Sequence, residues 1–436
     1  MRTKSSKKKI NIVSLGCSKN LVDSEVLMGQ LKANDFKVNF ESDEEADVVV
    51  INTCGFINDA KEESIDIILQ YINAKEQGLI DNVYVMGCLS ERYIKELETE
   101  IPDVDKYFGV NDINKVVTQL GGDYKKELIG ERQLTTPKQY AYLKISEGCD
   151  RRCTFCAIPS IRGKHKSKPK EEIISETRRL VAKGVKEVIL IAQDLTYYGY
   201  DLYGKNEFAN LLQSIAGIKG IEWIRLHYAY PAGFPVEVLD VIKERSNICN
   251  YIDMPIQHIN NRILSLMQRG HTKEGTTKLL DKIRTSLPEA ALRTTLIVGF
   301  PGETEEEFNE LVDFVQEYKF DRLGVFTYSP EEGTRAFKLP DNVPEELKQA
   351  RLEKIMAVQQ EVSLEKNTAR VGKVFKTMID RKEGEFYIGR TEYDSPEVDN
   401  EMIIDPEGKE LEIGKFYPVI VSKADFFDLF GKISQM

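Results

Sequence analysis

The chain has 436 residues, of which 41% are hydrophobic and 30% are charged, and its formal net charge is −11. This composition is typical of a folded globular protein and excludes a mainly disordered or fibrous chain, and the length suggests about three domains. No apolar run approaches the ~18 residues that a membrane span needs. The net negative charge argues against a whole-surface attraction to nucleic acid.

The first residues do not have the pattern of a secretion signal. Lys7, Lys8 and Lys9 precede a short apolar segment, 10–15, which is followed by Gly16 and Cys17. That segment is shorter than the ~7–15 apolar residues of a signal peptide, so we predict a basic tail, a first strand and a cytosolic protein. Without a secretion signal, the seven cysteines favour metal ligation or catalysis over a disulfide framework.

Three apolar segments near the start share one pattern, because each ends beside a cysteine. The predicted strands 10–15, 48–51 and 83–86 are followed by Cys17, Cys54 and Cys88, and helical segments are predicted at 23–32 and 61–75. Alternating strands and helices indicate a parallel sheet, whose carboxyl-end loops gather at one edge. We therefore expect the three cysteines to converge as a metal centre, although each alone could be a small buried side chain.

A polar segment, 121–139, contains Gly121, Gly122 and Pro137 and is predicted to be a linker. Beyond it, strands and helices alternate again. The predicted strands are 141–146, 187–192, 223–228, 251–255, 292–298 and 323–328. The predicted helices are 170–182, 208–216, 236–244, 260–267 and 304–318, the last with a capping box formed by Thr304 and Glu307. Six such steps are fewer than the eight of a full TIM barrel, so a partial, open barrel is predicted.

A long helix over 344–369 is predicted next, and the character of the chain then changes. Short β-type runs at 374–379, 386–389, 401–404 and 417–421 are separated by turn signals. A small closed β-barrel of about five strands fits this pattern.

The strongest chemical signal is the triplet Cys149, Cys153 and Cys156, directly after the first strand of the partial barrel. Iron–sulfur clusters are held by cysteine thiolates, usually four, and three local ligands would leave one iron open for a catalytic role. A zinc site with His165 as the fourth ligand is the alternative. Cys249 stands apart and is interpreted as a core residue.

Weaker signals lie at other predicted strand ends. The turn 298–303 contains Gly299, Pro301, Gly302 and Glu303 between a strand and a helix, where backbone groups can approach a ligand. The other polar candidates at strand ends are Gln193, Asp194, His227, Gln257 and His258. The basic residues around the triplet could contact RNA, an anionic partner or a carboxylate, or form a solvated face; they are Arg151, Arg152, Arg162, Lys164, His165, Lys166, Lys168 and Lys170.

The triplet at the end of a first barrel strand resembles the radical S-adenosylmethionine (SAM) superfamily. The complete arrangement resembles the methylthiotransferases of that superfamily. The resemblance implies an N-terminal methylthiotransferase domain (1–122) with an auxiliary cluster, a linker (123–138), a radical SAM domain with a (β/α)6 barrel (139–368) and a TRAM domain (369–436).

The resemblance also implies two 4Fe-4S clusters with separate tasks. Cys149, Cys153 and Cys156 would hold the cluster that cleaves SAM to a 5′-deoxyadenosyl radical, and Cys17, Cys54 and Cys88 would hold the auxiliary cluster that carries the sulfur. A second SAM would supply the methyl group, and a flavodoxin- or ferredoxin-type protein would supply electrons. The expected cofactor contacts are Gln193, Arg293, Gly299, Pro301, Gly302 and Glu303.

Two branches of this family compete, because one modifies adenosine in tRNA and the other modifies the β-carbon of an aspartate in ribosomal protein S-twelve. The sequence is similar to the second branch in the stretches 142–163, 191–194, 224–231, 328–334 and 389–399. Residues 371–436 contain nine Lys and Arg against fourteen Asp and Glu, a net charge of −5. An acidic barrel suits a basic ribosomal protein better than tRNA. A tRNA methylthiotransferase and, more distantly, a zinc-dependent binding protein are the alternatives.

Overall fold

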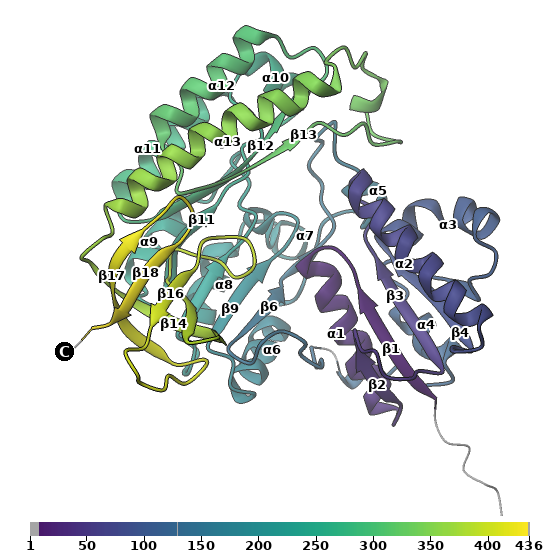
Figure 1. Cartoon of the computed structure of the whole chain (residues 1–436). Coiled ribbons are helices and arrows are strands. Elements are labelled where there is room, and N and C mark those ends of the chain that lie inside the picture. Colours follow the sequence, from purple (N-terminus) through teal and green to yellow (C-terminus); the bar gives the residue numbers. More distant parts are fainter. Residues whose placement is uncertain (1–7, 129, 435–436) are drawn as a thin grey trace, which may run out of the picture. The chain divides into compact units, whose positions relative to one another are not determined.

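The computed structural model describes residues 8–128 and 130–434. The first residues of the predicted basic tail, 1–7, lie outside this range. The chain forms two compact units, shown together in Figure 1. The first comprises residues 1–136, 142–150 and 157–179, and the second comprises residues 137–141, 151–156 and 180–436.

The first unit contains a five-stranded parallel sheet in the order β2-β1-β3-β4-β5. Its strands are β1 (Lys9–Ser14), β2 (Lys37–Phe40), β3 (Val48–Thr53), β4 (Asn82–Gly87) and β5 (Lys106–Tyr107). Its helices are α1 (Ser18–Ala33), α2 (Asn58–Glu76), α3 (Cys88–Glu100) and α4 (Ile113–Gln119). This confirms the predicted parallel α/β domain.

Both faces of this sheet are buried, because the side chains of β1, β3 and β4 alternate between two apolar clusters. Ile12 and Val50 pack with Leu27 of α1 on one face. Ile51 and Val85 pack on the other face, with side chains of α2 and α3. The continuous apolar runs seen in the sequence are typical of strands covered on both sides. Two short strands, a short helix and a 3-10 turn also lie between residues 126 and 167: η1 (Lys126–Leu128), β7 (Ser146–Glu147), α5 (Ile158–Ile161) and β8 (Lys166–Ser167).

A six-stranded sheet has the order β13-β12-β11-β10-β9-β6, and the pairs from β9 to β13 are parallel. Its strands are β6 (Tyr140–Lys144), β9 (Glu187–Ile191), β10 (Trp223–Leu226), β11 (Ile248–Asp253), β12 (Ala291–Val298) and β13 (Arg322–Thr327). The helices and 3-10 turns between and after them are α6 (Lys170–Ala182), η2 (Leu195–Tyr197), α7 (Tyr200–Tyr203), α8 (Phe208–Ala216), α9 (Glu237–Glu244), α10 (Asn261–Leu266), α11 (Lys273–Ser286), α12 (Glu305–Tyr318) and η3 (Ala336–Lys338). Six strands in sequential order, with the sheet left open, confirm the predicted partial barrel.

The predicted capping box at the start of α12 is present. The Thr304 side chain accepts a hydrogen bond from the Glu307 N–H, and the Glu307 carboxylate accepts one from the Thr304 N–H. The long helix α13 (Glu345–Thr368) runs beside α12 (Figure 1). Arg351 of α13 reaches the start of α12, where its guanidinium lies 2.6 Å from Glu303.

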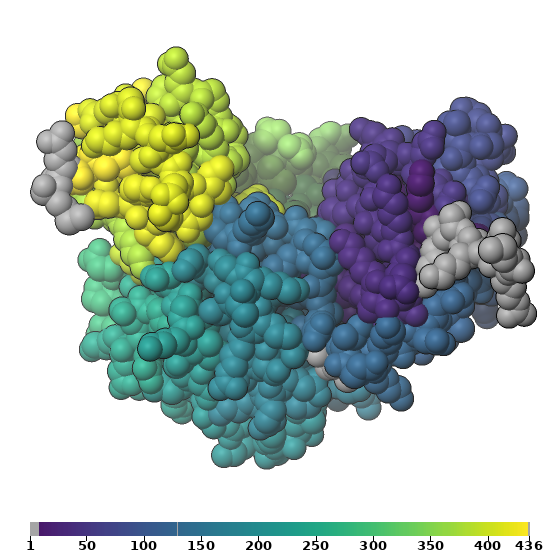
Figure 2. All heavy atoms as spheres, turned by 90° about the horizontal axis from the view of Figure 1, so that it is seen from below, coloured from purple at the N-terminus to yellow at the C-terminus, as the bar shows by residue number. Residues whose placement is uncertain are grey.

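The C-terminal strands close into a barrel in the order β14-β15-β16-β18-β17, as the sequence predicted. They are β14 (Val374–Glu383), β15 (Phe386–Arg390), β16 (Met402–Asp405), β17 (Phe416–Ala424) and β18 (Leu429–Ile433). Ile379, Tyr387 and Val419 are among the buried residues of its core. The packed atoms form a rounded lobe, yellow in Figure 2.

The loop 391–400 of this small barrel packs against the strands of the six-stranded sheet. Asp399 accepts a hydrogen bond from the Tyr251 hydroxyl at 2.7 Å, and Ser395 contacts the His227 ring at 2.8 Å. Arg322 at the start of β13 pairs with Asp394. The small barrel is therefore fixed to the larger one by buried polar contacts.

The Glu187 carboxylate lies fully buried between two guanidinium groups at this junction. Arg225 Nε is 2.7 Å from one oxygen and Arg390 Nη1 is 2.9 Å from the other. Arg225 also donates to the Glu392 carbonyl oxygen at 2.8 Å.

In the described part of the chain, none of the helices is both long and apolar enough to span a bilayer.

Candidate metal centres and cofactor-binding turns

The three N-terminal cysteines lie at the carboxyl ends of β1, β3 and β4, which are neighbours in the sheet. Cys17 directly precedes α1, Cys54 directly follows β3, and Cys88 is the first residue of α3. Two of the three thiols therefore stand at helix N-termini, where the backbone dipoles favour the thiolate form. This arrangement agrees with the convergence that the strand pattern predicted.

Each of these cysteines has a glycine beside it, and two of the glycines allow the loops to pack this closely. Gly16 has φ +86°, and a Cβ atom there would lie 2.8 Å from Cys54 Sγ. Gly87 has φ +104°, and its Cβ would lie 2.6 Å from the Thr53 backbone nitrogen. Contacts this short do not accommodate a side chain, so the glycines are required for the cysteine-bearing loops to meet.

Gly16→Ala is therefore expected to open the N-terminal cysteine site. In a Cys149→Ala, Cys153→Ala, Cys156→Ala background, we expect reconstituted iron to fall from about four atoms to below about one. Gly78→Ala is the matched control, because Gly78 has a similar φ of +73° with no neighbouring atom within 4 Å and meets only the left-handed strain of ~1–2 kcal/mol. Equal iron content in both variants would contradict the packing argument.

The environment of the three thiols is uneven. Burial raises the pKa of Cys88 to about 12, and a hydrogen bond from Arg162 opposes that shift. Burial likewise raises the pKa of Cys54. For Cys17, desolvation is outweighed by Lys19, Arg162 and backbone N–H groups at the start of α1, so its pKa is lowered. Arg162 acts on all three cysteines, and metal binding would have to displace the proton from at least the two buried thiols.

Arg162 is buried with 3% of its surface exposed, so the solvated-face interpretation of the basic cluster is wrong for this residue. Its guanidinium donates to Asn20 Oδ1, to Asp23 at 3.2 Å and to Glu147 at 2.9 Å. Lys144 binds the same two carboxylates. Burial opposes ionisation of Glu147, but Lys144 and Arg162 outweigh it and lower its pKa to about 2. Asp23 and Glu147 thus each bind both cations.

A second buried arginine lies in the segment predicted as a linker. Arg132 pairs with Glu25 of α1 and with Glu176 of α6, the latter at 3.0 Å. No signal in the sequence singles out Arg132, because polar composition alone does not distinguish a solvated linker from a segment held by buried ion pairs.

The cysteines of the second triplet have separate surroundings. The Cys149 N–H donates to the Gly163 carbonyl oxygen at 3.1 Å. Cys153 Sγ lies 3.2 Å from Arg269 Nη1 and 3.6 Å from the Tyr230 hydroxyl. The Arg269 guanidinium also stacks on the Tyr230 ring, 4.2 Å from its centroid. The Cys153 sulfur therefore lies against one cation and one hydroxyl.

His165, the fourth ligand in the zinc alternative, is buried, and its ring contacts the Ser167 hydroxyl at 3.0 Å. Within residues 8–128 and 130–434, no three His, Cys, Asp or Glu side chains are close enough to bind one metal ion. A cubane cluster binds each thiolate at a different iron and so accepts ligands that are farther apart. The cysteines at the sheet edge have the chemistry of such a donor set.

The turn after β12 is held by the Glu303 carboxylate. Its oxygens accept from the Gly299 N–H at 2.6 Å and from Arg351 at 2.6 Å, and the His258 ring lies 2.9 Å away. Gly299 and Gly302 have positive φ values, +70° and +81°. Glu303 therefore holds the shape of the turn from within, and the Gly302 N–H and carbonyl oxygen bond Asn342 and Arg262.

Two further predicted contacts occupy different positions. Gln193 follows β9 at its carboxyl end and is half-buried. Arg293 lies early in β12, where its guanidinium is 3.0 Å from Asp253 and 3.4 Å from Asp399 of the loop 391–400. The structure thus gives Arg293 a role at the junction of the two barrels, and its contact with a cofactor stays a prediction.

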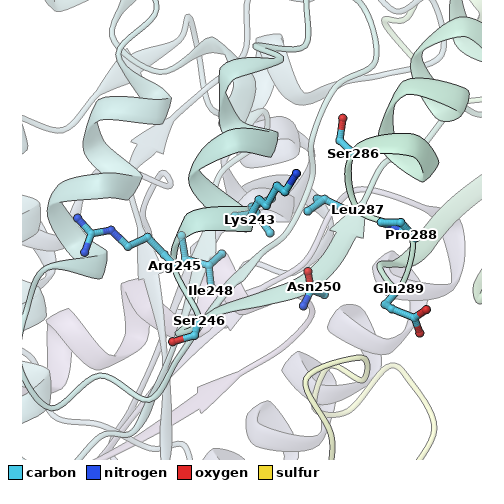
Figure 3. Close-up of a pocket in the computed structure, with 10 residues that line it drawn as sticks. Lys243, Arg245, Ser246, Ile248, Asn250, Ser286, Leu287, Pro288 and Glu289 are labelled. Atoms are coloured by element: carbon cyan, nitrogen blue, oxygen red, sulfur yellow. The ribbon is translucent and has the colours of Figure 1, made fainter.

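A pocket of about 290 Å³ lies between the end of α9, the start of β11 and the end of α11 (Figure 3). Lys243, Asn250 and Glu289 are among the residues that line it. This is the amino end of β11, whereas the predicted cofactor contacts Gln193 and Gly299 follow the carboxyl ends of their strands. The pocket contains none of the predicted site residues.

The comparisons with known proteins agree with these features. Residues 143–315 match the radical SAM superfamily, residues 371–433 match the TRAM domain, and residues 9–109 match an uncharacterized protein family, UPF0004. The chain is 58% identical to the ribosomal protein uS12 methylthiotransferase RimO of Christiangramia forsetii, with 99% of this chain and 96% of that protein covered. The protein of the same name from Flavobacterium johnsoniae is 56% identical, with 99% and 100% covered. The chain belongs to the RimO family of methylthiotransferases.

Solved structures with low sequence identity share the fold. The radical SAM methyltransferase TsrM from Kitasatospora setae, solved with tryptophan and a SAM analogue bound, has a TM-score of 0.55 at 16% identity, with 73% of this chain and 72% of that chain covered. The cobalamin-dependent SAM radical enzyme OxsB has a TM-score of 0.52 at 14% identity, with 80% and 56% covered. Membership of the radical SAM superfamily is thus supported by sequence and by fold.

Proposed function

We propose that this protein is a radical SAM methylthiotransferase that replaces a β-hydrogen of an aspartate in ribosomal protein uS12 with a methylthio group. The observation that carries the proposal is the position of Cys17, Cys54 and Cys88 at the carboxyl ends of three adjacent parallel strands. A radical SAM enzyme with only one iron–sulfur cluster has no need of these three additional cysteines. Relatives above 50% identity over nearly the whole chain carry the uS12 methylthiotransferase name.

In this proposal, Cys17, Cys54 and Cys88 hold one 4Fe-4S cluster and Cys149, Cys153 and Cys156 hold another. When bound, the clusters and SAM supply one-electron chemistry, sulfur and the methyl group. The residues of the chain bind and orient these groups. Arg269 and the Tyr230 hydroxyl contact the Cys153 sulfur, and the spacing of the three cysteines supports their joint role.

Gln193, Arg293, Gly299, Pro301, Gly302 and Glu303 are our candidates for SAM binding. For the turn, we infer that Glu303 acts by holding the shape of the turn, since the Glu303 carboxylate is fully buried and bonded within the protein.

The partners follow from the proposed reaction. The net charge of −5 over residues 371–436 favours a basic ribosomal protein, free or in the small subunit, over tRNA. A flavodoxin- or ferredoxin-type donor would deliver the electrons, and the reaction would take place in the cytoplasm.

The substrate choice is tested by offering both candidates to the anaerobically reconstituted enzyme with SAM and a reductant. We expect peptide mass spectrometry to find one methylthio group on an aspartate of uS12, and nucleoside analysis to find unchanged adenosine in tRNA. Methylthiolated adenosine together with unmodified uS12 would assign the protein to the tRNA branch instead.

A further inference from the structure

The Arg162 guanidinium is the charged group shared by the surroundings of all three N-terminal cysteines. It hydrogen-bonds the buried Cys88 thiol. It also donates to Asn20 Oδ1, which is itself 3.6 Å from Cys88 Sγ. Arg162 and Asn20 are thus two linked polar side chains beside the buried Cys88 thiol.

The charges around Arg162 are ordered rather than mixed. Asp23 and Glu147 each bind both Arg162 and Lys144, so the four side chains are neutral as a set. The Arg162 guanidinium contacts the Cys88 thiol as well as both carboxylates. The positive end of the network therefore faces the thiols, and the carboxylates hold the guanidinium in that orientation.

Resting on the proposed function, we propose that Arg162 is a positioning residue for the N-terminal cluster, whose negative charge its guanidinium offsets from the buried side. Three thiolates give this site a negative charge that an iron–sulfur core offsets only in part. A fixed cation within hydrogen-bonding reach favours both retention of the cluster and its reduction, because added negative charge is stabilised in a poorly solvated site. Arg162 follows Cys156 by six positions, so one chain segment carries radical-cluster ligands and serves the other cluster.

The test uses the full-length Cys149→Ala, Cys153→Ala, Cys156→Ala protein, in which only the N-terminal cluster can form. Its reduction is followed by an EPR-monitored redox titration. We expect Arg162→Gln to lower the equilibrium constant for one-electron reduction at least about tenfold, which is a fall in potential of about 59 mV or more. Arg162→Lys, which keeps the charge, is expected to stay within about threefold of the parent.

Lys144→Gln is the matched control, since it removes the same charge from the same two carboxylates without facing the cysteines. For Lys144→Gln, the equilibrium constant for one-electron reduction is expected to change by less than about threefold. A normal potential in Arg162→Gln, or an equal fall in Lys144→Gln, would overturn the proposal. If Arg162→Gln binds no iron, retention of iron in Arg162→Lys and Lys144→Gln supports the charge role, and its loss in all three variants refutes that role.

The same experiment separates this inference from the function on which it rests. A parent protein that contains no iron after removal of the second triplet would refute the N-terminal cluster itself, and with it the sulfur-transfer reaction. If the parent protein contains iron and Arg162→Gln leaves its reduction potential unchanged, only the role of Arg162 is refuted.

Discussion

After anaerobic reconstitution, the wild-type protein is expected to contain about eight iron atoms and a matching amount of acid-labile sulfide, and the Cys149→Ala, Cys153→Ala, Cys156→Ala variant about four. The reason is that the two cysteine sets are separate in sequence and in surroundings. Cys17, Cys54 and Cys88 follow strands of the first sheet, whereas the triplet follows β6. Iron and sulfide analysis measures both numbers directly.

SAM cleavage and sulfur transfer are expected to depend on different cysteines. Cys153→Ala is expected to lose SAM cleavage, measured as 5′-deoxyadenosine, while Cys54→Ala keeps cleavage and loses sulfur transfer to uS12. Cys249→Ala is the control, because Cys249 is buried beside Trp223 and Tyr251 in an apolar cluster and should leave all the iron in place. Zinc in place of iron, or about four irons that vanish with the triplet, would refute the two-cluster assignment.

Glu187→Gln is expected to destabilise the junction of the two barrels by ~3–5 kcal/mol, since it leaves buried arginines without their shared carboxylate. Trp223 is the only tryptophan in the sequence, and its ring lies 4.7 Å from that of Phe416 in the small barrel. Its fluorescence during urea unfolding therefore reports on this junction. Glu401→Gln is the matched control, because the Arg381–Glu401 pair is exposed and is worth at most ~1 kcal/mol.

The stabilising contribution of Glu187 is also expected to depend on pH. Burial raises the pKa of a carboxyl group, but Arg390 and Arg225 outweigh it and hold the pKa of Glu187 below its ordinary value. A carboxylate with a lowered folded-state pKa stabilises the fold above its unfolded pKa, and this contribution is lost as the pH falls through the folded value. The stability difference between wild type and Glu187→Gln should therefore shrink in acid. A difference that grows in acid would contradict the assignment.

The regular elements were predictable where apolar periodicity was strong. All six strands of the partial barrel and the capping box at Thr304 were found, because buried parallel strands read as apolar runs and caps have a local chemistry. The strand β5 was missed, since two residues carry no periodic signal. The helix α11 lies between the predicted segments 260–267 and 292–298 and was missed, and so was the strand β18, which follows the last predicted run, 417–421.

The cysteines of the candidate site could be predicted, but their surroundings could not. A cysteine at the end of a parallel strand lies at a known edge of a sheet, so three such positions predict one site. Arg162 and Asn20 have no comparable signal, because a basic residue in a basic stretch usually faces solvent. Only long-range packing shows that Arg162 is buried against α1 and pairs with Asp23 and Glu147.

Strand periodicity, cysteine spacing and motif identity are local properties of the chain, and they were enough to predict the three-part architecture, the positions of the two cysteine groups and the family. The tertiary structure alone decided which charges are buried: Arg162 beside the N-terminal cysteines, Arg132 in the predicted linker, and Glu187 between Arg225 and Arg390. The physical reason is that a charged side chain is buried only where partners from distant segments satisfy it, and no local pattern encodes those partners.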